Sequence, residues 1–202
     1  MSTQTRLAAA ALCLALLGTA AARADDGPEQ HRGFFLRMDL GLGYQRSYEA
    51  PYSITGGGGS FGLAIGGAVS ENVILAFHLL DSVAVAPSFS NGSIIATASN
   101  DVSVGVVVYG ANVTLYTMPF NGYLSLTLGP SKLALTENNQ TYATNWGVGG
   151  RVQLGKEWWV SDNWGLGVAV HFTWSRNPDG SDNNSGQWTT WSSAVAFSAT
   201  FN

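Results

Sequence analysis

The chain has 202 residues, a formal net charge of −4 and 11% charged residues, whereas soluble domains usually have about 25%. Its basic residues form no stripe or run, so nucleic acid is not expected as a partner. A chain of this length is expected to form one domain.

The N-terminal segment has the features of a secretory signal peptide. Arg6 gives it a positive start, residues 7–22 carry no charge, and an Ala-Arg-Ala triplet then offers a cleavage site. We therefore expect residues 1–24 to be removed and residues 25–32 to form a short periplasmic N-terminal segment. The only cysteine, Cys13, lies in the signal peptide, so disulfides and thiolate metal sites are not expected in the mature chain.

From residue 33 onward, large apolar residues alternate with small or polar residues. The pattern is clearest over residues 164–174, where it follows the period of two of a strand rather than the period of a helix. In two segments the large residues change phase partway, which predicts β-bulges near Gly110 and near Gly129-Pro130. The predicted strands are 33–46, 57–69, 72–84, 101–116, 122–135, 143–158, 163–175 and 187–201.

The eight predicted strands are typical of a barrel that crosses a membrane. Each has the roughly 9 to 11 residues that a tilted span needs, and the mature chain has no apolar run long enough for a membrane helix. Tight turns alternate with longer polar segments, and in outer-membrane barrels the tight turns face the periplasm. The longer segments are 47–56, 85–100, 136–142 and 176–186.

We therefore predict an all-β protein, an eight-stranded antiparallel up-and-down transmembrane β-barrel over residues 33–202. It is expected in the outer membrane of a Gram-negative bacterium, with both termini periplasmic. Aromatic residues near strand ends are expected to form girdles at the two bilayer interfaces. They are Tyr44, Trp146, Trp158, Trp159, Trp164, Trp174 and Trp191.

Six ionisable residues fall on the inward phase of the predicted strands. They are Arg37, Asp39, His78, Arg151, Glu157 and His171. Buried charges are costly unless they are paired, so we expect Arg37 and Arg151 to face Asp39 and Glu157 in a lumenal network. The favoured interpretation is that this network fills and rigidifies the interior. The alternative is a charge constriction in a narrow pore.

The alternating strands, the aromatic-rich turn at residues 155–168 and the last strand resemble the small eight-stranded outer-membrane barrels, the opacity-protein-like family. The resemblance implies that Phe197 and Phe201 form the signal that the barrel-assembly machinery reads, although Asn202 and not an aromatic residue ends this chain. It also implies contact with outer-membrane lipids and lipopolysaccharide, and a monomer without cofactors. The functions of such barrels are diverse, so the resemblance indicates fold and location rather than activity.

Three functions remain open at this stage. The favoured function is a structural or surface-interaction role in the cell envelope, and the first alternative is a narrow channel for small or hydrophobic solutes. A lipid-A-modifying enzyme is disfavoured because His171 lies on the inward phase and Thr173 stands where such enzymes have a serine, so we expect no enzyme. A soluble lipocalin-like barrel or β-sandwich is also disfavoured, because the bulky residues would overfill a small interior.

Overall fold

The computed structural model describes residues 31–180 and 186–202, so the predicted signal peptide lies outside the described residues. In this part of the chain no helix is long and apolar enough to cross a membrane. The strands are β1 Phe34–Glu49, β2 Tyr52–Ser70, β3 Val73–Val85, β4 Ser88–Ser90, β5 Ile95–Thr97, β6 Ser103–Thr117, β7 Gly122–Glu137, β8 Gln140–Ala143, β9 Gly147–Ser161, β10 Trp164–Pro178 and β11 Gln187–Phe201.

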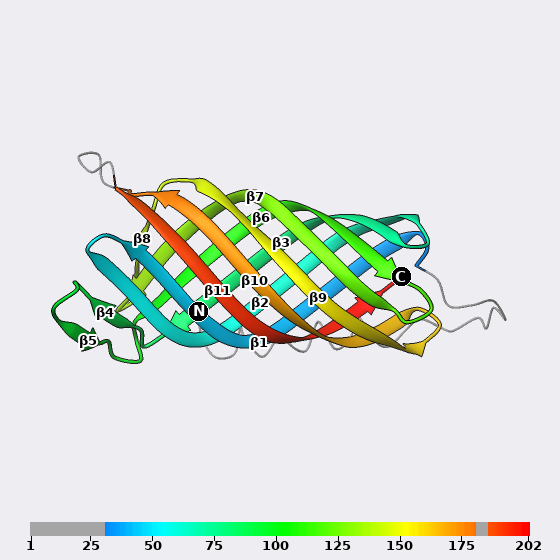
Figure 1. Cartoon of the computed structure of the whole chain (residues 1–202), viewed down its shortest axis with the longest axis horizontal. Coiled ribbons are helices and arrows are strands. Elements are labelled where there is room, and N and C mark those ends of the chain that lie inside the picture. Colours follow the sequence, from blue (N-terminus) through cyan, green and yellow to red (C-terminus); the bar gives the residue numbers. More distant parts are fainter. Residues whose placement is uncertain (1–30, 181–185) are drawn as a thin grey trace.

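Eight long strands form a closed antiparallel barrel, as the alternating pattern predicts. The order is β1-β11-β10-β9-β7-β6-β3-β2, and pairing of β1 with β2 closes the cycle. The strands are tilted, the short strands β4 and β5 project from one end, and the C-terminus lies at the opposite end (Figure 1). We call these the loop end and the terminus end. Closure satisfies the backbone hydrogen bonds of every long strand and leaves the barrel wall without a free edge.

The register is displaced as the strands close the barrel. Following paired residues from Arg46 across all eight strands leads to Leu36 on the same strand β1, which is a displacement of ten residues. Ten residues over eight strands is about 1.25 residues per strand step, or roughly 4 Å. This stagger decides which residues lie at the same height on the barrel.

Side chains alternate between the interior and the outer surface along each long strand. On β11, Val195 and Phe197 are 64% and 52% exposed, whereas the neighbouring Ala194 and Ala196 are buried. The large apolar residues therefore face outward and the small residues face inward, as predicted. This is the arrangement of a barrel surrounded by lipid rather than water.

Two of the predicted loops are tight hairpins instead. Glu49 pairs with Tyr52, so β1 and β2 continue through the segment 47–56 that was predicted as a loop. In the segment 136–142, β7 turns directly into β8 through Asn138 and Asn139, whose φ angles are 49° and 62°. Asparagine tolerates this left-handed conformation, which a two-residue hairpin turn requires. Polar residues are typical of loops, but strands that extend beyond a membrane can also be polar on both faces.

The predicted β-bulges are wrong. β6 and β7 keep the same register on both sides of Gly110 and Gly129-Pro130. Val104, Val106 and Val108 are at most 1% exposed and point into the barrel. The apparent change of phase is therefore a change in the chemistry of the interior, which is apolar toward the loop end and polar toward the middle.

Candidate functional site

The six predicted ionisable residues all point into the barrel. Arg37 and Asp39 come from β1, His78 from β3, Arg151 and Glu157 from β9, and His171 from β10. None of their side chains is more than 4% exposed. They face inward because they share the phase of the small residues on each strand, which is a consequence of the period of two.

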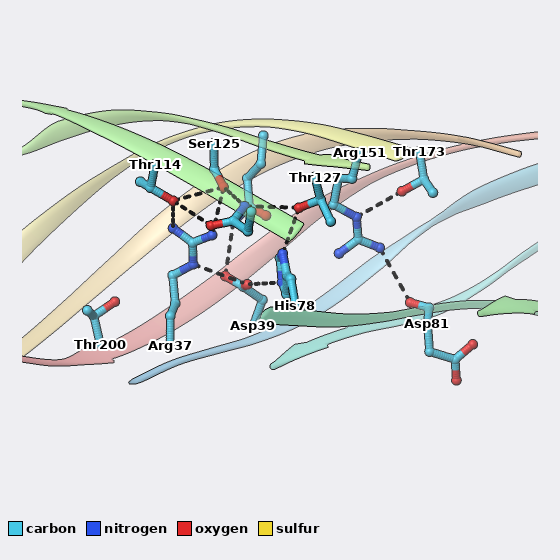
Figure 2. A network of polar contacts seen from close by, with 12 residues as sticks. Arg37, Asp39, His78, Asp81, Thr114, Ser125, Thr127, Arg151, Thr173 and Thr200 are labelled. Carbon is cyan, nitrogen blue, oxygen red and sulfur yellow. Dashed lines mark hydrogen bonds and ion pairs between the residues drawn. The ribbon is translucent and has the colours of Figure 1, made fainter. Parts of the chain in front are cut away.

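Asp39 is the centre of the polar interior. One of its carboxylate oxygens, Oδ2, lies 3.5 Å from Nε of Arg37 and 3.9 Å from Nε2 of His78. The other oxygen, Oδ1, accepts a hydrogen bond of 3.0 Å from the amide of Gln153. Figure 2 shows this group, which we call the central cluster, together with the hydroxyl residues around it. It joins strands β1, β3 and β9 across the lumen.

Hydroxyl groups and two aromatic rings, those of Phe35 and Tyr123, hold the Arg37 guanidinium. Its Nη2 donates to Ser125 Oγ at 3.0 Å, and its Nη1 lies 3.5 Å from Thr114 Oγ1. The ring centre of Tyr123 lies 4.9 Å from the guanidinium carbon, which is a cation–π distance. The imidazole of His78 is held in turn by Thr127 at 2.9 Å. The central cluster therefore fills the lumen instead of leaving its charges facing a water channel.

The predicted pairing is only partly correct, because neither Arg151 nor Glu157 is held by an ion pair in the described structure. Arg151 donates to Thr173 Oγ1 at 2.8 Å and to the backbone carbonyl of Asp81 at 3.5 Å (Figure 2). It also donates to Ser82 Oγ at 3.2 Å. Glu157 accepts from Thr200 at 2.7 Å and from Tyr116 at 3.2 Å. The two residues lie six positions apart on one strand, about 20 Å, so they cannot share a partner.

His171 lies beside this network without joining it. Neither of its ring nitrogens has a hydrogen-bond partner among the described residues. In the same part of the chain, no three histidine, cysteine, aspartate or glutamate side chains lie close enough together to hold a metal ion. The histidines therefore add bulk and polarity to the interior, and the described residues form no metal centre.

Glycine on the inward phase makes room for the larger groups. A Cβ added to Gly62 would lie 2.9 Å from Asp39 Oδ2 and 3.1 Å from His78 Nε2. A Cβ added to Gly155 would lie 2.5 Å from the ring of Tyr123. An interior of eight strands is only wide enough for side chains, so each large residue needs a small neighbour.

His31 closes the terminus end of the lumen, which the sequence did not predict. Its ring lies 3.7 Å from that of Tyr116 and 5.2 Å from that of Trp159, measured between centroids. Its two nitrogens contact the amide oxygens of Asn202 at 2.9 Å and Asn121 at 3.0 Å. His31 belongs to the segment predicted to be a short periplasmic extension, and a lone histidine there gives no signal of such a role.

At the loop end, the interior of the barrel opens into apolar hollows. Two hollows of about 440 Å³ and 380 Å³ share Ile54, Leu135 and Trp188 in their walls. The first also includes Phe89 from β4, and the second includes Val104 from β6. We call the two together the apolar basin. Sequence reasoning missed it because the inward valines of β6 were interpreted as the mark of a bulge.

The comparisons with known proteins address the fold. No protein-family model matches the chain, and no curated protein matches it. Among solved structures, Neisserial surface protein A aligns with a TM-score of 0.59 at 12% identity, over 84% of this chain and 96% of that one. This chain has the fold of an outer-membrane β-barrel.

Two further outer-membrane barrels align with lower scores. OprG from Pseudomonas aeruginosa aligns with a TM-score of 0.48 at 10% identity, over 87% of this chain and 100% of that one. Ail of Yersinia pestis aligns with a TM-score of 0.42 at 11% identity, over 83% of this chain and 99% of that one.

In this barrel, six of the seven predicted girdle residues lie on the outward phase. Tyr44, Trp146, Trp174 and Trp191 lie toward the loop end, and Trp158 and Trp164 lie toward the terminus end. The prediction is wrong for Trp159. This residue follows the outward Trp158 by one position, so it points inward and packs on His31. The position of the other six at the bilayer interfaces stays a prediction.

The predicted assembly residues occupy the outer face of the last strand. Phe197 is 52% exposed, and Phe201 packs on Trp164 with their ring centres 5.3 Å apart. Their recognition by the assembly machinery also stays a prediction. The pair considered for lipid deacylation faces the lumen, since His171 is 4% exposed and Thr173 accepts the hydrogen bond from Arg151.

Proposed function

We propose that this protein is a closed barrel of the Gram-negative outer membrane that binds small apolar molecules at its outward-facing loop end. The observation that carries the proposal is the apolar basin, which lies at one end of a lumen that is otherwise filled by side chains. The role is a form of surface interaction, with the ligand held in the mouth of the barrel.

The lengths of the connections support this orientation. Tight turns join the strands at the terminus end, whereas at the loop end the β1–β2 turn is equally tight but β4, β5 and β8 belong to longer connections. Since outer-membrane barrels keep their short turns periplasmic, the basin faces the outside of the cell. The termini then lie on the periplasmic side.

The walls of the basin suit a hydrocarbon better than a polar ligand. Ile54, Val104 and Leu133 form a buried apolar group, and Phe89, Leu135 and Trp188 pack against it. A dry cavity of about 150 Å³ is enough to bind benzene, so either hollow is large enough for a small apolar molecule. Transfer of such a molecule from water is favoured by about 25 cal/mol for each Å² of apolar surface buried.

At the loop end, buried side chains fill the lumen beside the basin and between the basin and the central cluster, among them Val106 and Val108. Gln45 donates to the carbonyl of Val104 at 3.2 Å, and Ser47 and Thr190 share a hydrogen bond of 2.9 Å. Asn177 donates to the Ser131 carbonyl at 2.8 Å. These side chains are at most 3% exposed. A ligand in the basin therefore meets a filled interior, which favours binding over passage through the barrel.

Methyl NMR of the folded protein in lipid nanodiscs, titrated with toluene, tests the proposal. The methyl groups of Ile54, Val104 and Leu135 are expected to shift and reach saturation. Those of the outward Leu40 and Val195 face lipid and serve as internal controls, and they are expected to change linearly as toluene enters the bilayer. A linear response of both sets would contradict the proposed site.

A pair of variants separates the basin from the rest of the loop end. Leu135→Asn places a polar amide in the wall and is expected to weaken toluene binding about tenfold, since a buried amide without a partner costs about 1–3 kcal/mol. Ile95→Asn is the matched control, because Ile95 is 76% exposed and is not part of the basin wall. Equal binding by the two variants would argue against the basin.

A further inference from the structure

Three cationic side chains point outward near the loop end of the barrel. They are Arg46 on β1, Lys132 on β7 and Arg176 on β10. Arg37 and Arg151 differ from them because they are buried in the lumen. The proposed apolar ligand does not explain these three outward cations, because they lie on the outer wall of the barrel and not in the basin.

The register places the three cations at nearly one height. Arg46 pairs with Trp191 and Trp191 pairs with Trp174, so the row perpendicular to the strands reaches Trp174 on β10. This row descends toward the terminus end by about 1.25 residues at each strand. On β10, two strands away from β1, the residue at the height of Arg46 therefore lies about 2.5 residues beyond Trp174, close to Arg176. On β7, four strands away from β1, the same row reaches Leu128. The residue at the height of Arg46 lies about five residues beyond it, within about one residue of Lys132.

Aromatic rings lie between and just below these cations. The ring of Trp146 lies 5.3 Å from the ammonium of Lys132. The rings of Trp174 and Trp191, 6.1 Å apart, occupy the strands between Arg46 and β9 at a level nearer the middle of the barrel. Still nearer the middle, Leu128, Phe172 and Val195 are exposed apolar residues. The outer surface thus changes from apolar to aromatic to cationic toward the loop end.

The charges of this arc are not neutralised by carboxylates of the described residues. Among the described residues, no ion pair joins Arg46, Lys132 or Arg176 to a carboxylate. Asp81 lies on β3, outside the arc that runs over β1, β11, β10, β9 and β7, and Glu49 and Glu137 lie at the loop-end termini of β1 and β7, beyond Arg46 and Lys132. The arc is therefore a positive surface on a chain whose formal net charge is −4.

We propose that this arc binds the phosphate groups of a phosphorylated glycolipid of the outer leaflet. Guanidinium and ammonium groups form charge-assisted hydrogen bonds with phosphate oxygens, and arginine does so through two parallel donors. The acyl chains of the lipid lie against the apolar belt below, and the tryptophan rings occupy the headgroup level between the two. A soluble anion would match only the cationic part of this surface, whereas a glycolipid matches all three layers.

Native mass spectrometry of the folded protein in detergent, with diphosphorylated lipid A as the probe, tests this assignment. Arg46→Gln/Lys132→Gln/Arg176→Gln removes the three charges and is expected to weaken lipid A binding about tenfold or more. Lys156→Gln is the matched control, since Lys156 contacts the rings of Phe120 and Trp158 at the terminus end. It is expected to bind as the unchanged protein does.

The lipid series decides what the arc recognises. Dephosphorylated lipid A and phosphatidylglycerol are both expected to bind more weakly than diphosphorylated lipid A, and inorganic phosphate is expected not to compete at equal concentration. Equal binding of the dephosphorylated lipid, or of the triple variant, would overturn the proposal. Equal binding of phosphatidylglycerol would overturn the assignment to a glycolipid. The heat-dependent gel shift of folded barrels shows that each variant has folded.

Discussion

Replacing Arg37 by methionine tests whether the central cluster is a structural plug. The substitution keeps most of the side-chain volume but removes the ion pair with Asp39, the hydrogen bond to Ser125 and the cation–π contact with Tyr123. Asp39 then remains as a buried carboxylate with Gln153 as its one hydrogen-bond donor. Removing one partner of a buried ion pair costs about 3–5 kcal/mol, so we expect a loss of this size in the free energy of unfolding.

Urea unfolding of the protein in lipid vesicles, followed by tryptophan fluorescence, measures this loss. With a slope of about 1–3 kcal/mol per molar urea, the midpoint of Arg37→Met falls by about 1 M or more. The double variant Arg37→Met/Asp39→Leu replaces both charges by apolar groups and is expected to recover most of the loss. Leu40→Met, on the outward face of the same strand, is expected to change stability by less than about 1.5 kcal/mol. An Arg37→Met protein as stable as this control would show that the central cluster does not stabilise the barrel.

Three further predictions concern the packing of the interior, each measured by the same unfolding assay. Gly62→Ala forces a Cβ against the central cluster and is expected to cost about 1–3 kcal/mol, whereas Gly59→Ala, whose added Cβ would be 3.8 Å from its nearest neighbour, is expected to be tolerated. His31→Ala removes two hydrogen bonds and two ring contacts at the terminus end and is expected to cost about 1–3 kcal/mol, so an unchanged midpoint would show that His31 does not close the barrel. Thr200→Val removes the 2.7 Å donor of the Glu157 carboxylate and is expected to cost about 1–3 kcal/mol; a neutral result would mean that water replaces the hydroxyl.

The alternation of residues was sufficient to predict the strands, their orientation toward lipid or lumen, and closure of eight of them into a barrel. It failed for the valines of β6. Large residues can move to the other face of a strand because the interior becomes apolar there, with no change in the backbone. They can also do so because a bulge has inserted one extra residue. Both produce a similar run of letters around Gly110, and only the observed pairing of β6 with β7 distinguishes them.

The choice of polar partners could not be predicted for a different reason. The inward phase identifies Arg37, Asp39, Arg151 and Glu157 as lumenal, but their mutual distances depend on the displacement of ten residues around the barrel. That displacement comes from the register of eight strand pairs, which the sequence does not reveal. Hydroxyl groups such as Thr173 are abundant on the same phase, and they supply hydrogen bonds where a carboxylate is out of reach.

Because the lumen is closed, the proposed functions lie at the loop end and on the outer wall. Single-channel recording of the folded protein in a planar bilayer, at two salt concentrations, tests this closure directly. The structure predicts no discrete conductance steps from protein whose folding has been verified in the same sample. Discrete steps with an ion preference that changes in Arg151→Ala would contradict the closure and show that the lumenal charges line an open pore.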